Sequence, residues 1–259
     1  MAILIFQHHP LEGPERLGAI LRGYGHRLRV CELYEDPTLP PDLDGIDGVV
    51  SLGGPMNVDQ ADEHAWMAGE MQMLREAHEH KIPVVGICLG AQLVAKALGG
   101  EVSAMEQPEV GFEPVQLAFP GTIDPVHNGI PWRTWQFHMH GQEVTTLPGD
   151  GTPLSGSKAC RTQAYKVGLT TYCFQYHFEW TRQTIDAVLE KNSAMVEQTG
   201  KSDEEIRAAI DAHYEMFRHL DDRLCHNIAA LLMPIDKRFG ARHAPAEPNP
   251  LKNWQPAKS

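Results

Sequence analysis

Short apolar segments that alternate with helical stretches constrain the fold of this chain more than any other feature. The apolar segments have the length of buried strands and occupy residues 2–7, 28–33, 48–52 and 84–87. Apolar side chains recur at helical spacing over residues 14–24, 62–80 and 89–98. Strands that alternate with helices build βαβ units. The sequence therefore predicts an α/β fold with a central, mostly parallel sheet flanked by helices.

The pattern changes after residue 100, where short β-like runs follow one another without long helices. These runs occupy residues 115–119, 134–138, 153–157, 164–166 and 171–176. We expect an antiparallel extension followed by return strands of the same core, so that a single domain covers residues 1–180.

A helical extension is expected over residues 181–240. Apolar positions over residues 185–196 mark one helix, and Ser202 with Glu205 has the pattern of a capping box that begins a second. The second helix carries an apolar face as far as Leu231, and this face must pack on the main sheet or on a second subunit of a homodimer.

Composition narrows the classes of function. The 259 residues carry 22 basic and 34 acidic side chains, a net charge of −12 without a run of three basic residues, which argues against a nucleic-acid partner. No stretch of about 18 apolar residues is present, so no transmembrane helix and no membrane partner are expected. Five cysteines without CxxC spacing favour a reduced, cytoplasmic protein. Residues 241–259 contain four prolines, which predict a disordered tail.

One cysteine stands where nucleophiles are found. Cys88 follows the apolar segment 84–87 and precedes a helix, with Gly86 and Gly90 two residues away on either side. This is the G-x-S-x-G nucleophile elbow with sulfur in place of oxygen. The tight turn requires small neighbours, and the helix N-terminus favours a thiolate. The amide of Leu89 would point to where an oxyanion forms, whereas the other four cysteines are expected to be structural.

A nucleophilic thiol needs a base, and the base needs a group that orients it. His177 and Glu179 are two residues apart at the end of the run 171–176, where extended backbone places both side chains on one side. Glu179 would accept a hydrogen bond from one imidazole nitrogen while the other faces the thiol. An H-x-E pair alone is weak evidence for catalysis, because such pairs are common on protein surfaces. The pair is informative here because the elbow around Cys88 is present in the same chain. Gly53 and Gly54, after the third apolar segment, would supply a second oxyanion donor.

Together these segments resemble the class I glutamine amidotransferases of the Cys-His-Glu triad type. That family combines G-x-C-x-G-x-Q, an upstream Gly-Gly-Pro loop and a downstream F-Q-x-H-x-E. The chain has these motifs in the same order at residues 86–92, 53–55 and 174–179. The resemblance covers residues 1 to about 180, the catalytic domain, and points to stand-alone members, because no segment resembles an ATP-dependent synthetase. It implies a flavodoxin-like fold with the site at the carboxyl ends of the strands.

The resemblance also implies a chemistry. Cys88 would attack the side-chain amide of glutamine or of another small γ-glutamyl compound and form a γ-glutamyl thioester. The amides of Gly54 and Leu89 would hold the oxyanion. His177, oriented by Glu179, would protonate the departing ammonia or amine and then activate water. Substrate contacts are implied for Gly53, Gln92, His140 and Gln142. A synthetase subunit that accepts the ammonia is the implied protein partner.

One departure bears on the substrate. Many relatives have His-Gly-Asp where this chain has His140-Gly141-Gln142. The Asp helps to hold the substrate's α-amino group, and a neutral amide is a weaker partner for an ammonium, so the change favours an altered γ-glutamyl compound over free glutamine. The alternatives are a γ-glutamyl peptidase or transferase on the same triad and a non-catalytic regulatory protein. An α/β-hydrolase acting on esters or lactones fits less well, because there the acid precedes the histidine.

Histidine pairs are the remaining signal, and they stand at positions 8 and 9, 78 and 80, and 138 and 140. An H-x-H pair on a strand places both imidazoles on one face, as zinc sites use. No third and fourth ligand stands at a recognised spacing, and no dinucleotide or phosphate loop follows a strand. We therefore expect neither a metal nor a cofactor.

Overall fold

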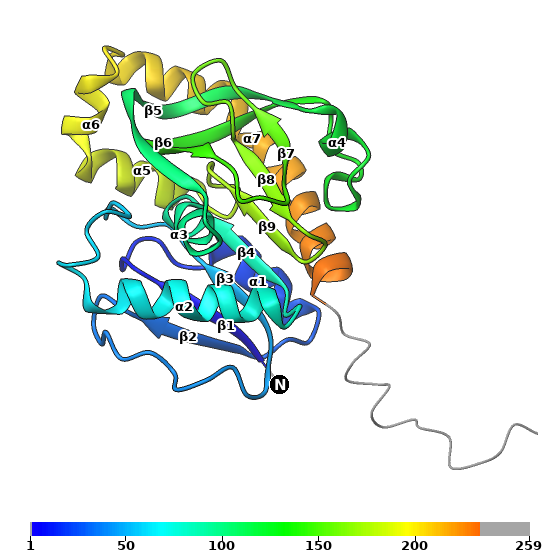
Figure 1. The fold of residues 1–259 in the computed structure, drawn as a ribbon. Helices are drawn as coiled ribbons and strands as arrows, with labels where there is room; N and C mark the ends of the chain where they lie inside the picture. The colour runs from blue at the N-terminus through cyan, green and yellow to red at the C-terminus, as the bar shows by residue number, and fades with distance from the viewer. Residues whose placement is uncertain (1, 234–259) are drawn as a thin grey trace, which may run out of the picture.

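The computed structural model describes residues 2–233 and places a nine-stranded sheet at their centre, in the order β2-β1-β3-β4-β9-β8-β7-β5-β6 (Figure 1). The strands are β1 (Ala2–Gln7), β2 (Leu28–Glu32), β3 (Ile46–Ser51), β4 (Val84–Ile87), β5 (Glu101–Leu117), β6 (Arg133–Thr146), β7 (Gly151–Gly156), β8 (Ala164–Val167) and β9 (Thr171–Phe174). The helices are α1 (Glu15–Gly23), α2 (Ala65–Glu79), α3 (Leu89–Ala97), α4 (Phe119–Thr122), α5 (Arg182–Lys191), α6 (Ser193–Gln198) and α7 (Asp203–Asn227), with a 3-10 helix η1 (Pro125–His127) and a π-helical turn η2 (Ile228–Leu232).

Five neighbouring strands, β2-β1-β3-β4-β9, run parallel to one another. Numbered along the chain among themselves they have the order 2-1-3-4-5, which is the order of flavodoxin-like sheets. Ligands of such sheets bind beyond the carboxyl ends of the strands, near the point where the strand order reverses, which here lies between β1 and β3. The predicted flavodoxin-like α/β fold is confirmed. The other four strands pair antiparallel, so the sheet as a whole is mixed.

Alternate side chains of the parallel strands enter two hydrophobic cores, one on each face of the sheet. Ile3 and Ile5 of β1 pack in the core that includes α1 and the end of α7. Leu4 and Phe6 pack in the core that includes α2 and α3. Figure 1 shows α2 and α3 on one face of these strands and α1 on the other. Because both faces are covered, β1 is apolar from Ala2 to Phe6 without a polar face, which is why it was recognisable in the sequence.

The antiparallel half extends much further than the sequence predicted. Strand β5 has 17 residues and pairs with β6 from Glu101 opposite Thr146 to Gln116 opposite Arg133, where only residues 115–119 and 134–138 were expected as strand. Much of β5 is exposed and two of its residues are prolines, so it has no apolar run that would reveal it. The predicted run 115–119 also ends early, since Phe119 begins α4.

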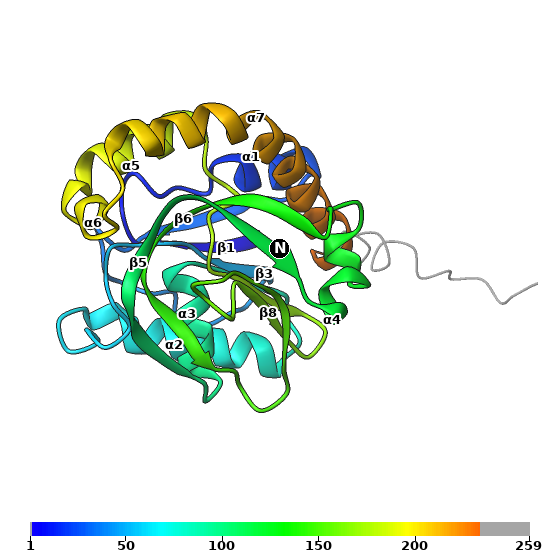
Figure 2. The same ribbon diagram turned by 90° about the horizontal axis from the view of Figure 1, so that it is seen from above.

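The helical extension packs on the rest of the described chain. The helix expected over residues 185–196 is broken at Asn192, whose Nδ2 donates to the Val188 carbonyl 2.8 Å away and separates α5 from α6. The capping box of Ser202 and Glu205 is confirmed at the start of α7. Helix α7 contacts α1, β5 and β6, and Figure 2 shows α5, α6 and α7 as an arc beside the β5–β6 pair. Its apolar face therefore meets its own chain.

The last part of the predicted helical extension, residues 234–240, and the predicted disordered tail, residues 241–259, lie outside the described residues. Within residues 2–233, no helix combines the length and the apolar character that crossing a membrane requires.

Candidate active site

The turn between β4 and α3 has the backbone geometry expected of a nucleophile elbow. Cys88 has φ 52° and ψ −109°, a conformation that costs a side-chain-bearing residue about 1–3 kcal/mol. A methyl carbon on Gly86 would lie 2.8 Å from the carbonyl oxygen of Gly90, and one on Gly90 would lie 2.0 Å from the carbonyl oxygen of Ser51. Both neighbours must therefore be glycine.

His177 is held in one orientation. Its Nδ1 donates to Glu179 Oε1 at 2.8 Å, and the side chains of both residues are 1% exposed. Its ring stacks on Trp180 with centroids 3.5 Å apart, and its backbone N–H donates to the Phe137 carbonyl at 2.9 Å. The strand was predicted over residues 171–176, with the pair at its end, but β9 ends at Phe174 and the pair lies in the segment after it. The contact between the two side chains forms nonetheless.

Cys88 and His177 meet although they are far apart in the sequence. Burial lowers the pKa of His177, but the charges of Glu179 and Cys88 and the side-chain hydrogen bonds to both raise it further, to about 10. A positively charged imidazole is therefore held next to the sulfur at neutral pH. This is the arrangement in which a thiol is activated by a histidine and the histidine is oriented by a carboxylate.

Backbone amides are available next to the sulfur. The N–H of Leu89 is at the first position of α3, where an N–H has no acceptor within the helix. Gly54 packs against this residue, because a methyl carbon on Gly54 would lie 3.0 Å from Leu89 Cδ2 and 2.8 Å from His8 Cβ. The two residues predicted to hold an oxyanion thus lie side by side at the carboxyl ends of β3 and β4.

A buried ion pair supports the loop of Gly53, and the sequence motifs did not reveal it. His8 Nδ1 donates to the Gly53 carbonyl at 3.1 Å, and its Nε2 donates to Glu70 Oε2 at 2.8 Å. Ser51 Oγ donates to Glu70 Oε1 at 2.6 Å. Burial lowers the pKa of His8, but Glu70 raises it further, which agrees with both ring nitrogens donating. The available signal was that Glu70 falls on the apolar face of α2, next to Met67.

A cavity of about 310 Å³ opens in front of the sulfur, at the carboxyl ends of β1, β3 and β4 and against α5 and α6. It contains most of the predicted site residues. Its lining includes Cys88, Gly54, Leu89, Gln92, His140 and Gln142, and also Glu12, Val188, Lys191, Asn192 and Met195. Gly53, His177 and Glu179 are buried and do not line it.

The family follows from the sequence profile of the class-I glutamine amidotransferases, which matches residues 17–196. The chain belongs to this family. It is 29% identical over 187 residues to the glutamine amidotransferase-like protein YfeJ of Salmonella typhimurium, covering 69% of this chain and 77% of that one. It is 31% identical over 160 residues to a subunit of the glutamine-hydrolyzing GMP synthase of Thermoplasma volcanium, covering 61% and 75%.

Solved structures agree with this family. The glutamine amidotransferase from Methylobacillus flagellatus superimposes with a TM-score of 0.78 at 25% identity and covers 88% of this chain and 92% of that one. A glutamine amidotransferase from Thermotoga maritima has a TM-score of 0.77 at 22% identity, covering 89% and 98%, and supports the fold.

This amidotransferase holds its predicted substrate contacts in a network. Gln92 Nε2 donates to the Gln142 carbonyl at 3.1 Å and to Gln175 Oε1 at 3.2 Å. Gln142, the residue in place of the family's Asp, accepts the Val58 N–H through its side-chain oxygen at 3.3 Å. Its amide group is therefore tied to the loop after β3, and it brings no charge to the cavity.

A carboxyl group that the sequence analysis missed lies near the imidazole. A methyl carbon placed on Gly53 would lie 2.4 Å from Glu12 Oε2 and 2.6 Å from His177 Cε1. The side chains of Glu12 and His177 are therefore close to each other next to Gly53. Burial raises the pKa of Glu12, and the nearby His177 opposes that rise. Glu12 stands in the loop after β1, without a motif around it. Lys191 of α5 brings the opposite charge to the cavity.

Proposed function

We propose that the protein hydrolyses the side-chain amide of glutamine or of a γ-glutamyl compound through a thioester on Cys88. The observation that carries this proposal is the strained backbone of Cys88, whose sulfur raises the pKa of the adjacent His177, which Glu179 orients, beside a cavity of about 310 Å³. Strain of this kind persists where the surrounding structure requires it, and it is concentrated at active sites.

The first half of the reaction uses the charged imidazole as an acid. The Cys88 sulfur attacks the amide carbon as a thiolate, and the developing oxyanion is held by the N–H groups of Leu89 and Gly54. One such donor contributes roughly 3–4 kcal/mol in comparable sites. His177 gives its proton to the leaving nitrogen. The C–N bond then breaks, ammonia or an amine departs, and a γ-glutamyl thioester remains.

The second half reverses the roles of the groups. The neutral imidazole of His177 takes a proton from a water molecule as that water adds to the thioester carbon. The same two amides hold the second oxyanion. The C–S bond breaks, the new carboxyl group gives its proton to the solvent, glutamate leaves, and the Cys88 sulfur and the protonated His177 are restored. Glu179 stabilises the positive charge in each half without exchanging a proton.

The apolar part of the cavity lining favours a substituted γ-glutamyl amide over free glutamine. Apolar side chains from the helical extension, Val188 and Met195, line the cavity together with Cys88 and would contact a leaving group larger than ammonia. Glu12 and Lys191 supply the charges that the α-ammonium and α-carboxylate of a γ-glutamyl group require, in place of the family's Asp. A γ-glutamyl peptidase or transferase activity fits these observations.

Supply of ammonia to a separate acceptor is the second candidate. It is favoured by the similarity to proteins named as subunits of a glutamine-hydrolyzing GMP synthase, a name that designates one part of a larger enzyme. In that case free glutamine would be the preferred substrate and turnover would rise when the acceptor is added. A reduced, cytoplasmic setting suits both candidates, because each requires a free thiol.

The test is a panel of γ-glutamyl compounds that includes glutamine, with release of ammonia or amine measured and the thioester detected by mass spectrometry. A diazoketone analogue of glutamine should label Cys88 alone among the five cysteines. Cys88→Ala should abolish turnover and labelling, whereas Cys173→Ala, at a buried cysteine of β9, should retain both. Full turnover by Cys88→Ala would refute the mechanism. The preferred substrate separates the two candidate functions.

A further inference from the structure

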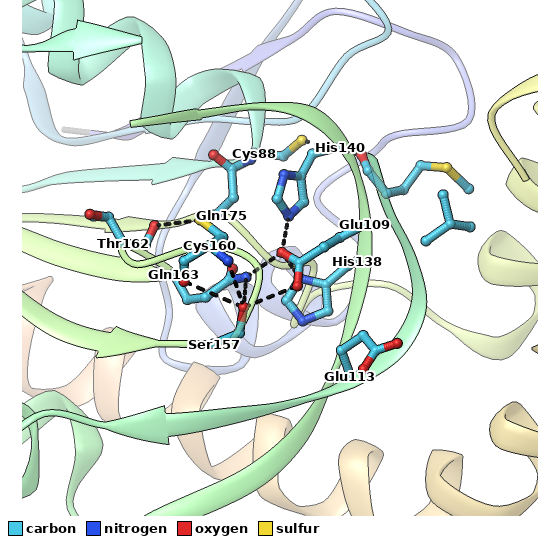
Figure 3. A network of polar contacts seen from close by, with 12 residues as sticks. Cys88, Glu109, Glu113, His138, His140, Ser157, Cys160, Thr162, Gln163 and Gln175 are labelled. Carbon is cyan, nitrogen blue, oxygen red and sulfur yellow. Dashed lines mark hydrogen bonds and ion pairs between the residues drawn. The ribbon is translucent and has the colours of Figure 1, made fainter. Parts of the chain in front are cut away.

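Three chemically active side chains gather on one face of the β5–β6 pair (Figure 3), and one of them, His140, lines the cavity. Glu109 of β5 is directly opposite His140 of β6, and His138 is two residues away, opposite Gly111. Facing positions and positions two residues apart place side chains on the same face of a sheet. Their residues are only 6%, 3% and 0% exposed, respectively. The proposed amide hydrolysis does not use Glu109 or His138.

The hydrogen bonds of His140 leave two acceptors facing each other. Its Nδ1 lies 3.0 Å from the Gln142 carbonyl oxygen, which can only accept, so Nδ1 carries the hydrogen. In the neutral ring, Nε2 then presents a lone pair. That nitrogen lies 3.1 Å from Glu109 Oε2. Two acceptors at this distance repel unless a positive centre, either a proton or a metal ion, lies between them.

His138 adds a third donor atom to the same point. Its Nδ1 lies 3.9 Å from Glu109 Oε2, and neither of its ring nitrogens has a hydrogen-bond partner among the described residues. Fully buried polar groups nearly always have a partner. One ligand atom from each of the three residues lies within 4.8 Å of the others. A metal ion about 2 Å from each ligand therefore requires only a small inward movement of the imidazoles.

The carboxylate is oriented for such a role. Ser157 Oγ donates to Glu109 Oε1 at 3.0 Å, and Gln163 Nε2 donates to Oε2 at 2.6 Å. Figure 3 shows both donors on the far side of Glu109 from His140. Hydrogen bonds of this kind, from groups that do not touch the metal, fix the ligands of protein metal sites.

We propose that Glu109, His138 and His140 bind a divalent transition-metal ion of the zinc class. Two imidazoles and one carboxylate are a donor set of known zinc sites, and three protein ligands leave one position of a tetrahedral ion open. His140 also lines the cavity, so the ion would rigidify the part of the cavity wall that His140 forms. The sequence offered only the H-x-H half of the site, because Glu109 comes from another strand.

The experiment uses the full chain after removal of bound metal with a chelator. Zn²⁺ binding is measured by equilibrium dialysis, and the site is then loaded with Co²⁺ for absorption spectroscopy. The parent should bind one equivalent, and both His138→Leu and Glu109→Gln should weaken binding by at least about 100-fold. His127→Leu is the matched control, because His127 is also buried with both ring nitrogens unpartnered among the described residues. Cys88→Ala controls for zinc on the elbow sulfur, and both controls should bind like the parent.

Three outcomes would overturn the assignment. The first is that the parent protein binds no zinc and ring-nitrogen NMR shows His140 doubly protonated, because a proton then lies between His140 Nε2 and Glu109. A second is unchanged zinc affinity in His138→Leu and Glu109→Gln. The third is a sulfur-to-cobalt charge-transfer band in the parent, because none of the three ligands is a thiol. A cobalt spectrum with nitrogen and oxygen ligands alone supports the site even if the His138 variant fails to fold.

Discussion

Replacing Glu179 by glutamine tests whether a buried carboxylate holds the proton on His177. The two side chains are 2.8 Å apart and nearly inaccessible to water. Burial alone would lower the pKa of the ring, yet Glu179 and Cys88 together raise it to about 10. Relative to the ordinary histidine value, this change corresponds to about 5 kcal/mol in favour of the charged ring. Glutamine keeps the shape and can still accept the Nδ1 hydrogen, but it removes the charge.

The expected result of Glu179→Gln is therefore an imidazole that loses its proton at neutral pH. In the parent, the stability linked to this proton is complete below about pH 6.5 and is lost as the pH rises toward 10, because the folded state holds the proton more tightly than the unfolded state. In Glu179→Gln, this pH-dependent contribution to the free energy of unfolding should be largely lost. Turnover at neutral pH should fall by about 10²- to 10⁴-fold, because the acid that protonates the leaving nitrogen is missing.

Two assays check this result without knowledge of the substrate. Ring-nitrogen NMR follows the titration of His177, and the rate of alkylation of Cys88 by iodoacetamide is measured against pH. Glu70→Gln is the matched control, since it removes a buried carboxylate from a different histidine, His8. The reasoning is refuted if His177 of the parent titrates near 6.5, or if Glu179→Gln leaves both profiles unchanged.

Three further results are expected. Gly90→Ala should lower the free energy of unfolding, measured in urea, by about 3 kcal/mol or more, because the added carbon collides with the backbone of Ser51. The control Gly23→Ala has open space around the added carbon and should not destabilise the protein. Equal stability of the two variants would contradict the packing of the elbow. Burial lowers the pKa of His127 to about 4, so the stability that its neutral ring permits is complete above pH 6.5 and is lost as the pH falls toward 4. Between pH 7 and pH 4, the free energy of unfolding of His127→Leu should therefore fall by about 3 kcal/mol less than that of the parent. Parallel curves of unfolding free energy against pH would disprove this. Lys191→Met should raise KM for a γ-glutamyl substrate about tenfold with little change in kcat, because Lys191 would contact the substrate equally in the ground state and the transition state. An unchanged KM would show that Lys191 does not bind the substrate.

The sequence by itself determined the parallel half of the fold and the residues that we propose to react. Strands buried on both faces, such as β1 and β4, appear as short apolar runs, and the helices between them have regular spacing. The elbow around Cys88 is also local, because two glycines and a strand-to-helix turn create it within a few residues. His177 and Glu179 are neighbours in the chain, so their contact needed no long-range information.

Tertiary structure alone decided everything that depends on strand register or on partners far apart in the chain. The length of β5 came from its pairing with β6 and not from an apolar run, which its exposed residues lack. The contact of His8 with Glu70 spans 62 residues, and that of Glu109 with His140 spans two strands. A sequence lists donors and acceptors but not which of them meet. Only the packing of the sheet brings such groups within hydrogen-bond distance and away from water, where hydrogen bonds and ion pairs are electrostatically stronger.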